Sequence, residues 1–210
     1  MPAKPKARSE VSANNPCPFL RALVAQGELP DDKTSIAELT STIVRVARTG
    51  DGAPDLPAVA IRAIALLANG LGPLQLTRNA LGGVQLDGLR GGPLDKKGAG
   101  SGILDAHARI DQGQLDRLDE FAGDKLDARG QAERGLDLED LRRMMDANFE
   151  RAAGHRRLID RKLMDGEWPI LLQVMGKSGQ AGRYLSLAEV RDLFVERRLP
   201  DRMTKRLGAA

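Results

Sequence analysis

Apolar residues recur at the three- and four-residue spacing of α-helices in a series of short segments along the chain. Pro18 suits the first position of a helix, and Gly27 ends the segment that it opens. Ser35 and Ser186 are each followed three residues later by a glutamate, the spacing of a capping box, and Asp137 is expected to cap a further helix. The pattern therefore predicts an all-α fold.

The amino-acid composition agrees with a helical domain. Only 3% of the residues are aromatic, with Trp168 and Tyr184 each the only residue of its type, whereas β-sandwiches are usually richer in such side chains. A length of 210 residues with 41% hydrophobic content suits one core. We predict a single domain of about eight helices over residues 15–200, between a disordered tail (1–14) and a basic tail (201–210), and we identify no internal repeat.

Two segments are apolar on nearly all sides. The first runs from Pro57 to Leu67 and predicts a central buried helix, while the second spans 166–176. Between them, the glycine-rich stretch 70–102 predicts broken structure. The longest apolar run, 58–71, contains Arg62 and is too short to span a bilayer, so we expect no integral membrane segment.

Charge and cysteine content narrow the functional classes. The 32 basic and 29 acidic residues leave a net charge of +3 and form no basic stripe with interleaved aromatic residues, so we expect no nucleic-acid partner. A single cysteine forms no internal disulfide and suits a reducing cytoplasm. The basic residues near the start precede no apolar stretch of the kind found in secretory signals, and we predict a cytoplasmic location.

The one cysteine, Cys17, lies between Pro16 and Pro18. A proline at the first helical position places Cys17 at the helix cap, where free N–H groups and the helix dipole lower the pKa of a thiol. A thiolate is a ligand of ferric haem iron. The alternative is that Cys17 is a small buried hydrophobic residue, which is common for an isolated cysteine.

The surrounding residues carry a family resemblance. Residues 16–30 contain Pro-Cys-Pro, then Leu-x-x-Leu, then Gln-Gly-x-Leu-Pro. This stretch resembles the start of the haem-thiolate chloroperoxidases and aromatic (unspecific) peroxygenases. The resemblance implies an all-α fold around one haem b, with Cys17 as the axial ligand of the haem iron.

A second stretch, 101–110, resembles the family segment that holds a divalent cation near a haem propionate. Asp105 stands where the family has a metal-binding glutamate, and His107 stands where it has an aspartate. Arg109 replaces a serine of the metal site, so it could pair with a propionate directly in place of Mg²⁺ or another divalent cation. The alternative is that Asp105 caps a turn and His107 is an ordinary surface residue.

A third stretch, 166–200, resembles the C-terminal part of the same family, in which a distal glutamate opens an apolar helix. This resemblance implies that Glu167 is the distal acid–base residue, with His107 as a further candidate catalytic residue. A lone carboxylate among apolar neighbours must be desolvated or turned into a pocket, although glutamate is also common in the first turn of a helix. Residues 98–199 also resemble caleosins, which are plant peroxygenases.

The resemblance implies a haem-thiolate peroxidase or peroxygenase that uses hydrogen peroxide to oxidise or oxygenate a small organic substrate. In this hypothesis Cys17 binds the iron, and Glu167 moves a proton between the oxygen atoms of the peroxide. Three alternatives remain open: a non-catalytic haem sensor or carrier, a haem enzyme of changed reaction on the same fold, and a helical interaction domain without a cofactor.

Overall fold

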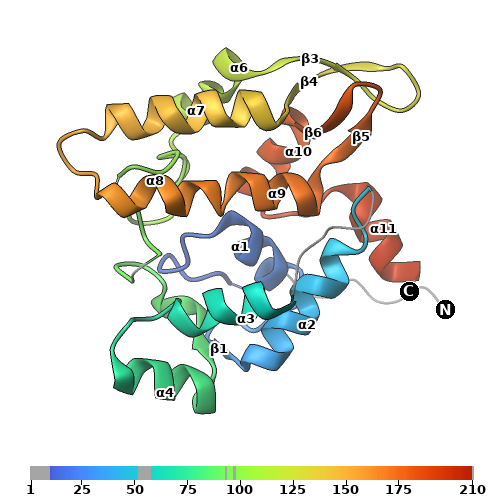
Figure 1. The fold of residues 1–210 in the computed structure, drawn as a ribbon. Helices are drawn as coiled ribbons and strands as arrows, with labels where there is room; N and C mark the ends of the chain where they lie inside the picture. The colour runs from blue at the N-terminus through green and yellow to red at the C-terminus, as the bar shows by residue number, and fades with distance from the viewer. Residues whose placement is uncertain (1–9, 52–57, 93, 97, 210) are drawn as a thin grey trace.

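The computed structural model describes residues 10–51, 58–92, 94–96 and 98–209 (Figure 1). The chain is 53% helical and 12% strand, with a two-stranded and a four-stranded antiparallel sheet. The predicted all-α fold is therefore wrong, and the protein is a mixed α/β structure.

The helices and strands are short and alternate along the chain. The α-helices of the described residues are α1 (Pro18–Ala25), α2 (Ile36–Ala47), α3 (Ala58–Leu67), α4 (Pro73–Gly82), α5 (Gln112–Asp116), α6 (Leu118–Phe121), α7 (Leu138–Arg151), α8 (Leu158–Asp165), α9 (Trp168–Met175), α10 (Leu187–Arg191) and α11 (Asp201–Ala209). A 3₁₀ turn covers Leu86–Gly88 and a π-helical turn covers Asp192–Glu196. The strands are β1 (Lys33–Thr34), β2 (Val84–Gln85), β3 (Gly123–Leu126), β4 (Ala132–Leu136), β5 (Lys177–Gly179) and β6 (Gly182–Ser186).

The strands escaped sequence analysis because they are brief and polar. None of the described strands exceeds five residues. Strand β3 consists of glycine, aspartate, lysine and leucine, and every second one of these residues is exposed. Such a strand has no alternating apolar pattern to detect. Residues 124–133, which read as a charged connector, instead form most of a hairpin, in which Asp127 accepts hydrogen bonds from the backbone of Arg129 and Gln131.

The four-stranded sheet is built from two similar hairpins, each followed by a helix. Its strand order is β3-β4-β6-β5, so the inner strands β4 and β6 pair, with Leu136 opposite Leu185. Gly-Gln-Ala-x-Arg-x-Leu occurs at 130–136 and again 49 positions later at 179–185. The chain therefore contains an internal repeat, contrary to the sequence reading, and the repeated leucines face each other at the centre of the sheet.

Helices α7, α8 and α9 lie between this sheet and the N-terminal helices (Figure 1). The core beneath α7 includes Leu141, Met144 and Met145, all buried. Trp168 of α9 stacks on Phe194 with ring centroids 6.2 Å apart. These contacts anchor the start of α9 in the core through Trp168, while Glu167, directly before it, stays exposed.

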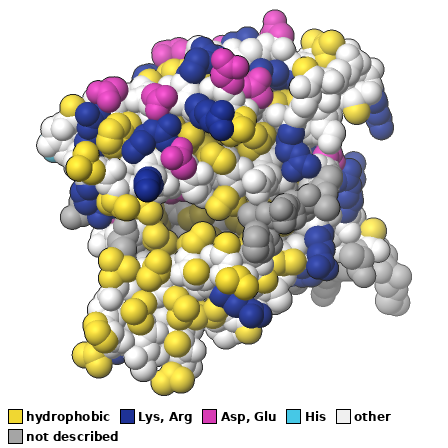
Figure 2. Space-filling model, in the orientation of Figure 1, with side chains coloured by type: hydrophobic (Ala, Val, Ile, Leu, Met, Phe, Trp, Pro, Cys, Tyr) yellow, Lys and Arg dark blue, Asp and Glu magenta, His cyan; other side chains and the backbone are white. Residues whose placement is uncertain are grey.

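Helix α3 does not lie at the centre of the molecule, so the predicted buried helix is wrong. Of its residues only Ile61 and Ala65 are buried, while Val59 is 74% exposed. The helix packs on α2 and α4 at the edge of the fold, where apolar side chains gather at the surface (Figure 2). Apolarity alone did not reveal which side of the helix would be covered.

The predicted tails are only partly described. Residues 1–9 of the N-terminal tail lie outside the described residues, but Val11 is buried and the backbone N–H of Ser12 donates to the carboxylate of Asp31. At the other end, the stretch predicted to be a basic tail forms helix α11, with Met203 buried. Within the described ranges, no helix is both long and apolar enough to cross a membrane.

Candidate functional site

Cys17 is the N-cap of α1, and Pro18 occupies the first helical turn, as the sequence predicts. The Cys17 N–H donates to the side-chain oxygen of Asn15 at 3.1 Å, which fixes the entry of the chain into the helix. Gly27 follows the end of α1 with a positive φ of 68°, and the backbone N–H groups there close the last turn. Cys17 itself is partly exposed as a residue and carries a free thiol.

The predicted lowering of the Cys17 pKa is wrong in its net direction. Burial raises the pKa of the thiol because the thiolate is desolvated, and this effect exceeds the opposing hydrogen bonds from the backbone of Leu20 and Phe19. The cations of Lys96 and Arg21 also act to lower the pKa of Cys17, by smaller amounts. The helix start therefore stabilises a thiolate only in part.

Lys96 connects Cys17 with Glu167. Its ammonium forms an ion pair with the carboxylate of Glu167, directly before α9, and lies close enough to Cys17 for the two charges to interact. The Lys96 side chain is buried, whereas that of Glu167 is half exposed. Lys96 thus pairs with one of the two candidate residues, Glu167, and its charge acts on the pKa of the other, Cys17.

The loop that carries Lys96 is anchored to α8. The guanidinium of Arg157 donates to the backbone carbonyl of Asp95 at 2.7 Å and pairs with the fully buried carboxylate of Asp160 at 2.7 Å. Burial lowers the pKa of Lys96 to about 8, although Cys17, Asp95 and Asp160 act to raise it. Lys96 is therefore a cation held in place that can lose its proton under mildly alkaline conditions.

The Asp105 segment forms a turn at the surface. One Asp105 oxygen accepts hydrogen bonds from the backbone N–H groups of His107 and Arg109, both at 2.8 Å, and the other accepts from the Arg109 side chain at 2.8 Å. These contacts lower the pKa of Asp105 to about 2, with the backbone of Arg109 as the largest cause. The carboxylate makes these hydrogen bonds within the turn. Asp105 therefore caps a turn, which is one of the two alternatives expected from the sequence.

Neither His107 nor Arg109 makes a contact, among the described residues, that bears on the role predicted for it. His107 is exposed, and the Arg109 guanidinium pairs with Asp105 rather than with another anion. The turn is nevertheless tied to the Cys17 region, because Arg90 donates both to the carbonyl of Asp105 and to that of Ala13. A propionate role for Arg109 and a catalytic role for His107 stay predictions.

The donor set near Cys17 contains groups that a haem would need. The thiol is the kind of ligand that the predicted proximal position requires, and the cations Lys96 and Arg21 would complement the negative charge of a porphyrin. The amide nitrogen of Asn15, a fully buried residue, has no hydrogen-bond partner among the described residues and could donate to an anionic group. Lys96 takes part in the Glu167 pair, so entry of a haem between Cys17 and Glu167 would require this lysine to move.

No cluster of three or more histidine, cysteine, aspartate or glutamate side chains able to hold a metal ion occurs within the described ranges. Asp105, the candidate ligand of a divalent cation, accordingly belongs to no such cluster within these ranges. The structure gives the predicted Mg²⁺ site no support beyond that single carboxylate.

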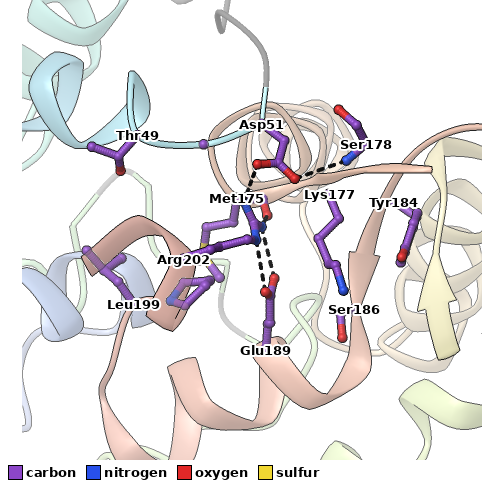
Figure 3. Close-up of polar contacts among 12 residues, drawn as sticks. Thr49, Asp51, Met175, Lys177, Ser178, Tyr184, Ser186, Glu189, Leu199 and Arg202 are labelled. Carbon is purple, nitrogen blue, oxygen red and sulfur yellow. Dashed lines mark hydrogen bonds and ion pairs between the residues drawn. The ribbon is translucent and has the colours of Figure 1, made fainter. Parts of the chain in front are cut away.

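A separate polar network joins the C-terminal helix to the body of the protein (Figure 3). Arg202 of α11 lies between the carboxylates of Glu189, at 2.9 Å, and Asp51, at 3.4 Å. Asp51 also pairs with Arg206 at 2.8 Å and accepts a weak hydrogen bond from the backbone N–H of Ser178. Every carboxylate here is paired with arginine, so the network is structural rather than a site for a ligand.

Comparison with known proteins finds no matching family model, no similar curated protein and no similar solved structure. The functional interpretation therefore depends on the residues of this chain and on their geometry.

Sequence reasoning missed Lys96 and Arg157. Lys96 lies in a glycine-rich stretch where a lysine normally faces solvent, and nothing in its neighbours marks it as buried. Arg157 is one of many arginines in a segment that resembles a solvated face. The signal that could have found them is the need of a buried carboxylate, Asp160, for a cationic partner.

Proposed function

We propose that the protein is a haem-thiolate peroxidase or peroxygenase in which Cys17 binds the iron and Glu167 serves as the acid–base residue. The observation that carries this proposal is that both residues interact with the same buried lysine, Lys96, although they are 150 positions apart in the chain. In this proposal the two residues belong to one site at the start of two helices, α1 and α9.

A haem bound through a thiolate supplies an iron centre that activates peroxide. Cys17, at the start of α1, offers its sulfur to the metal, and the backbone N–H groups of Phe19 and Leu20 stabilise the negative charge on that sulfur. Glu167 is half exposed, so it can exchange a proton with solvent and hold it at a carboxylate oxygen. Lys96 stabilises the anionic form of either partner.

The test is an absorption spectrum of the protein loaded with haem, recorded oxidised and then reduced with carbon monoxide, beside Cys17→Ala. We expect a strongly red-shifted Soret band that is lost in the variant, because only a thiolate ligand produces that shift. A band that survives in Cys17→Ala, or a protein that takes up no haem, would contradict the assignment.

The acid–base role has its own variant, Glu167→Gln. It should retain haem and reduce peroxide-driven turnover roughly a hundredfold or more, because general acid–base catalysis contributes about that much. The proton-transfer assignment would be wrong if the loaded variant turned over at the original rate.

The ion pair between Lys96 and Glu167 favours a second candidate. A haem-binding sensor or carrier needs no acid–base residue. A Glu167 carboxylate engaged in an ion pair with a lysine is compatible with that function. That candidate predicts the red-shifted Soret band of a thiolate-bound haem. It also predicts that Glu167→Gln binds haem and absorbs light as the unmodified protein does.

A further inference from the structure

Large apolar side chains are exposed together on one edge of the molecule. Of the eleven large hydrophobic residues exposed in the described ranges, six lie between positions 59 and 81. We call these six the α3–α4 face: Val59, Ile64, Leu67, Leu71, Leu74 and Leu81. In Figure 2 apolar side chains cover this lower part of the molecule, where Figure 1 places α3 and α4.

The exposure follows from how the helical hairpin is held. Helix α4 buries only Asn79, whose amide donates to the carbonyl of Leu66 at 2.8 Å. Leu74 and Leu81 are seven residues apart and therefore lie on the same side of α4, 78% and 86% exposed. A contiguous apolar surface of this kind marks an interaction site more often than a free surface.

Within the segment that carries α3 and α4, the charged side chains are of one sign. Residues 58–86 contain Arg62 and Arg78 and no aspartate or glutamate. Neither arginine pairs with a carboxylate in the part of the chain that the structure describes, although most other arginines there do. Apolar residues interspersed with unpaired cations complement an anionic lipid surface, since an interfacial helix needs both.

A groove adjoins the apolar face. It has a volume of about 530 Å³, and its lining includes the cations Lys33 and Arg78, the amides of Gln75, Asn79 and Gln85, and the exposed Leu81. The two cations suit a phosphate group. The neighbouring leucine would then be positioned toward the acyl chains.

We propose that the α3–α4 face docks on the surface of a membrane that contains anionic phospholipids. The apolar residues enter the interface, and Arg62, Arg78 and Lys33 contact the phosphate groups. Helices of ten residues, as α3 and α4 are, suit a position in the plane of the interface rather than across it. This inference does not depend on the proposed haem chemistry.

The test is co-sedimentation with vesicles of an equimolar mixture of phosphatidylglycerol and phosphatidylcholine, beside vesicles of phosphatidylcholine alone. We expect binding to the anionic vesicles that weakens with salt, and at least about tenfold weaker binding of the double variant Leu74→Glu and Leu81→Glu. Because both leucines are exposed, the substitution should leave the circular dichroism spectrum unchanged.

The matched control is Leu158→Glu, a change at a leucine that is 93% exposed on α8. It should bind the anionic vesicles as the unmodified protein does. The proposal is overturned if the protein binds neither kind of vesicle or if Leu158→Glu loses binding equally. It is also overturned if sedimentation velocity shows a dimer that the double variant abolishes, because a second copy would then cover this face.

Discussion

At the scale of single residues, Lys96 matters most for the candidate site. It is a buried cation that neutralises Glu167 and stabilises negative charge on Cys17. A lysine taken out of water loses solvation, and its pKa therefore falls to about 8 in spite of the acidic groups around it. The same ammonium pairs with the Glu167 carboxylate and contributes to lowering the pKa of the Cys17 thiol.

Replacing Lys96 with methionine removes the positive charge and keeps most of the side-chain volume. The pKa of Cys17 should then rise further, because a cation that stabilises the thiolate is lost. Alkylation of Cys17 by iodoacetamide in the cofactor-free protein should slow roughly three- to tenfold near neutral pH. The measurement is the alkylation rate as a function of pH.

Lys162→Met is the control for this change, since Lys162 is exposed on α8. Its rate profile should match that of the unmodified protein. Identical profiles for Lys96→Met and Lys162→Met would show that Lys96 does not influence the thiol.

At the scale of secondary-structure elements, the two repeated units begin their helices differently. Asp137 caps α7 by accepting from the N–H groups of Glu139 and Asp140, and the Asp140 carboxylate accepts from the backbone N–H of Asp137. Ser186, at the equivalent place before α10, instead donates its hydroxyl to Glu133 at 2.6 Å. Ser186 and Glu189 thus have the spacing of a capping box, but the Ser186 side chain does not cap α10.

Glu133 explains the difference. Its carboxylate accepts from Ser186, from the hydroxyl of Tyr184 at 2.5 Å and from Lys177. Burial would raise the pKa of Glu133, but these three donors lower it overall. The carboxylate links β4 to β5 and β6, and the Tyr184 ring lies against Gly135, where a side chain would collide with it.

The contribution of the α7 cap can be isolated with Asp137→Ala and Asp137→Asn. Both variants lose the ion pair with Lys125, but asparagine keeps an oxygen that can accept from the helix N–H groups. Asp137→Ala should therefore be less stable than Asp137→Asn by about 1 kcal/mol. Urea unfolding at neutral pH measures the difference, and equal stabilities would show that the side chain does not act as a cap.

At the scale of the whole molecule, the C-terminal helix closes the fold. Arg206 donates to the carbonyls of Thr49 and Gly50, and Arg202 pairs with Asp51 and Glu189. These contacts join α11 to residues more than 150 positions earlier in the chain. Burial acts to raise the pKa of Asp51, but Arg206 and Arg202 lower it overall.

Asp51→Asn should reduce the free energy of unfolding by about 1–2 kcal/mol at pH 7, because a carboxylate that pairs with two arginines loses its charge. A carboxyl whose pKa is lower in the folded than in the unfolded protein stabilises the fold above its unfolded pKa of about 3.9. This contribution disappears as the pH falls through the folded pKa. The difference between the two proteins should accordingly shrink below about pH 4.

Urea unfolding over this pH range makes the measurement. Asp146→Asn serves as the control, because Asp146 is 65% exposed and its pair with Arg161 is expected to add little. A loss of stability in Asp51→Asn that stayed constant down to low pH would contradict the electrostatic explanation.

The sequence by itself determined the elements whose signals are local. The Cys17 cap, the Pro18 helix start, the Gly27 stop and the Asp137 cap depend on neighbouring residues, and the structure confirms each of them. Only the tertiary structure decided the strands, because backbone pairing holds them together without an alternating apolar pattern in the sequence. It also decided the exposure of α3, because the sides of this helix are all apolar and differ only in what packs on them. Finally, it decided the burial of Lys96 and its pairing with Glu167, because a charged residue is buried only where distant partners offset its lost hydration.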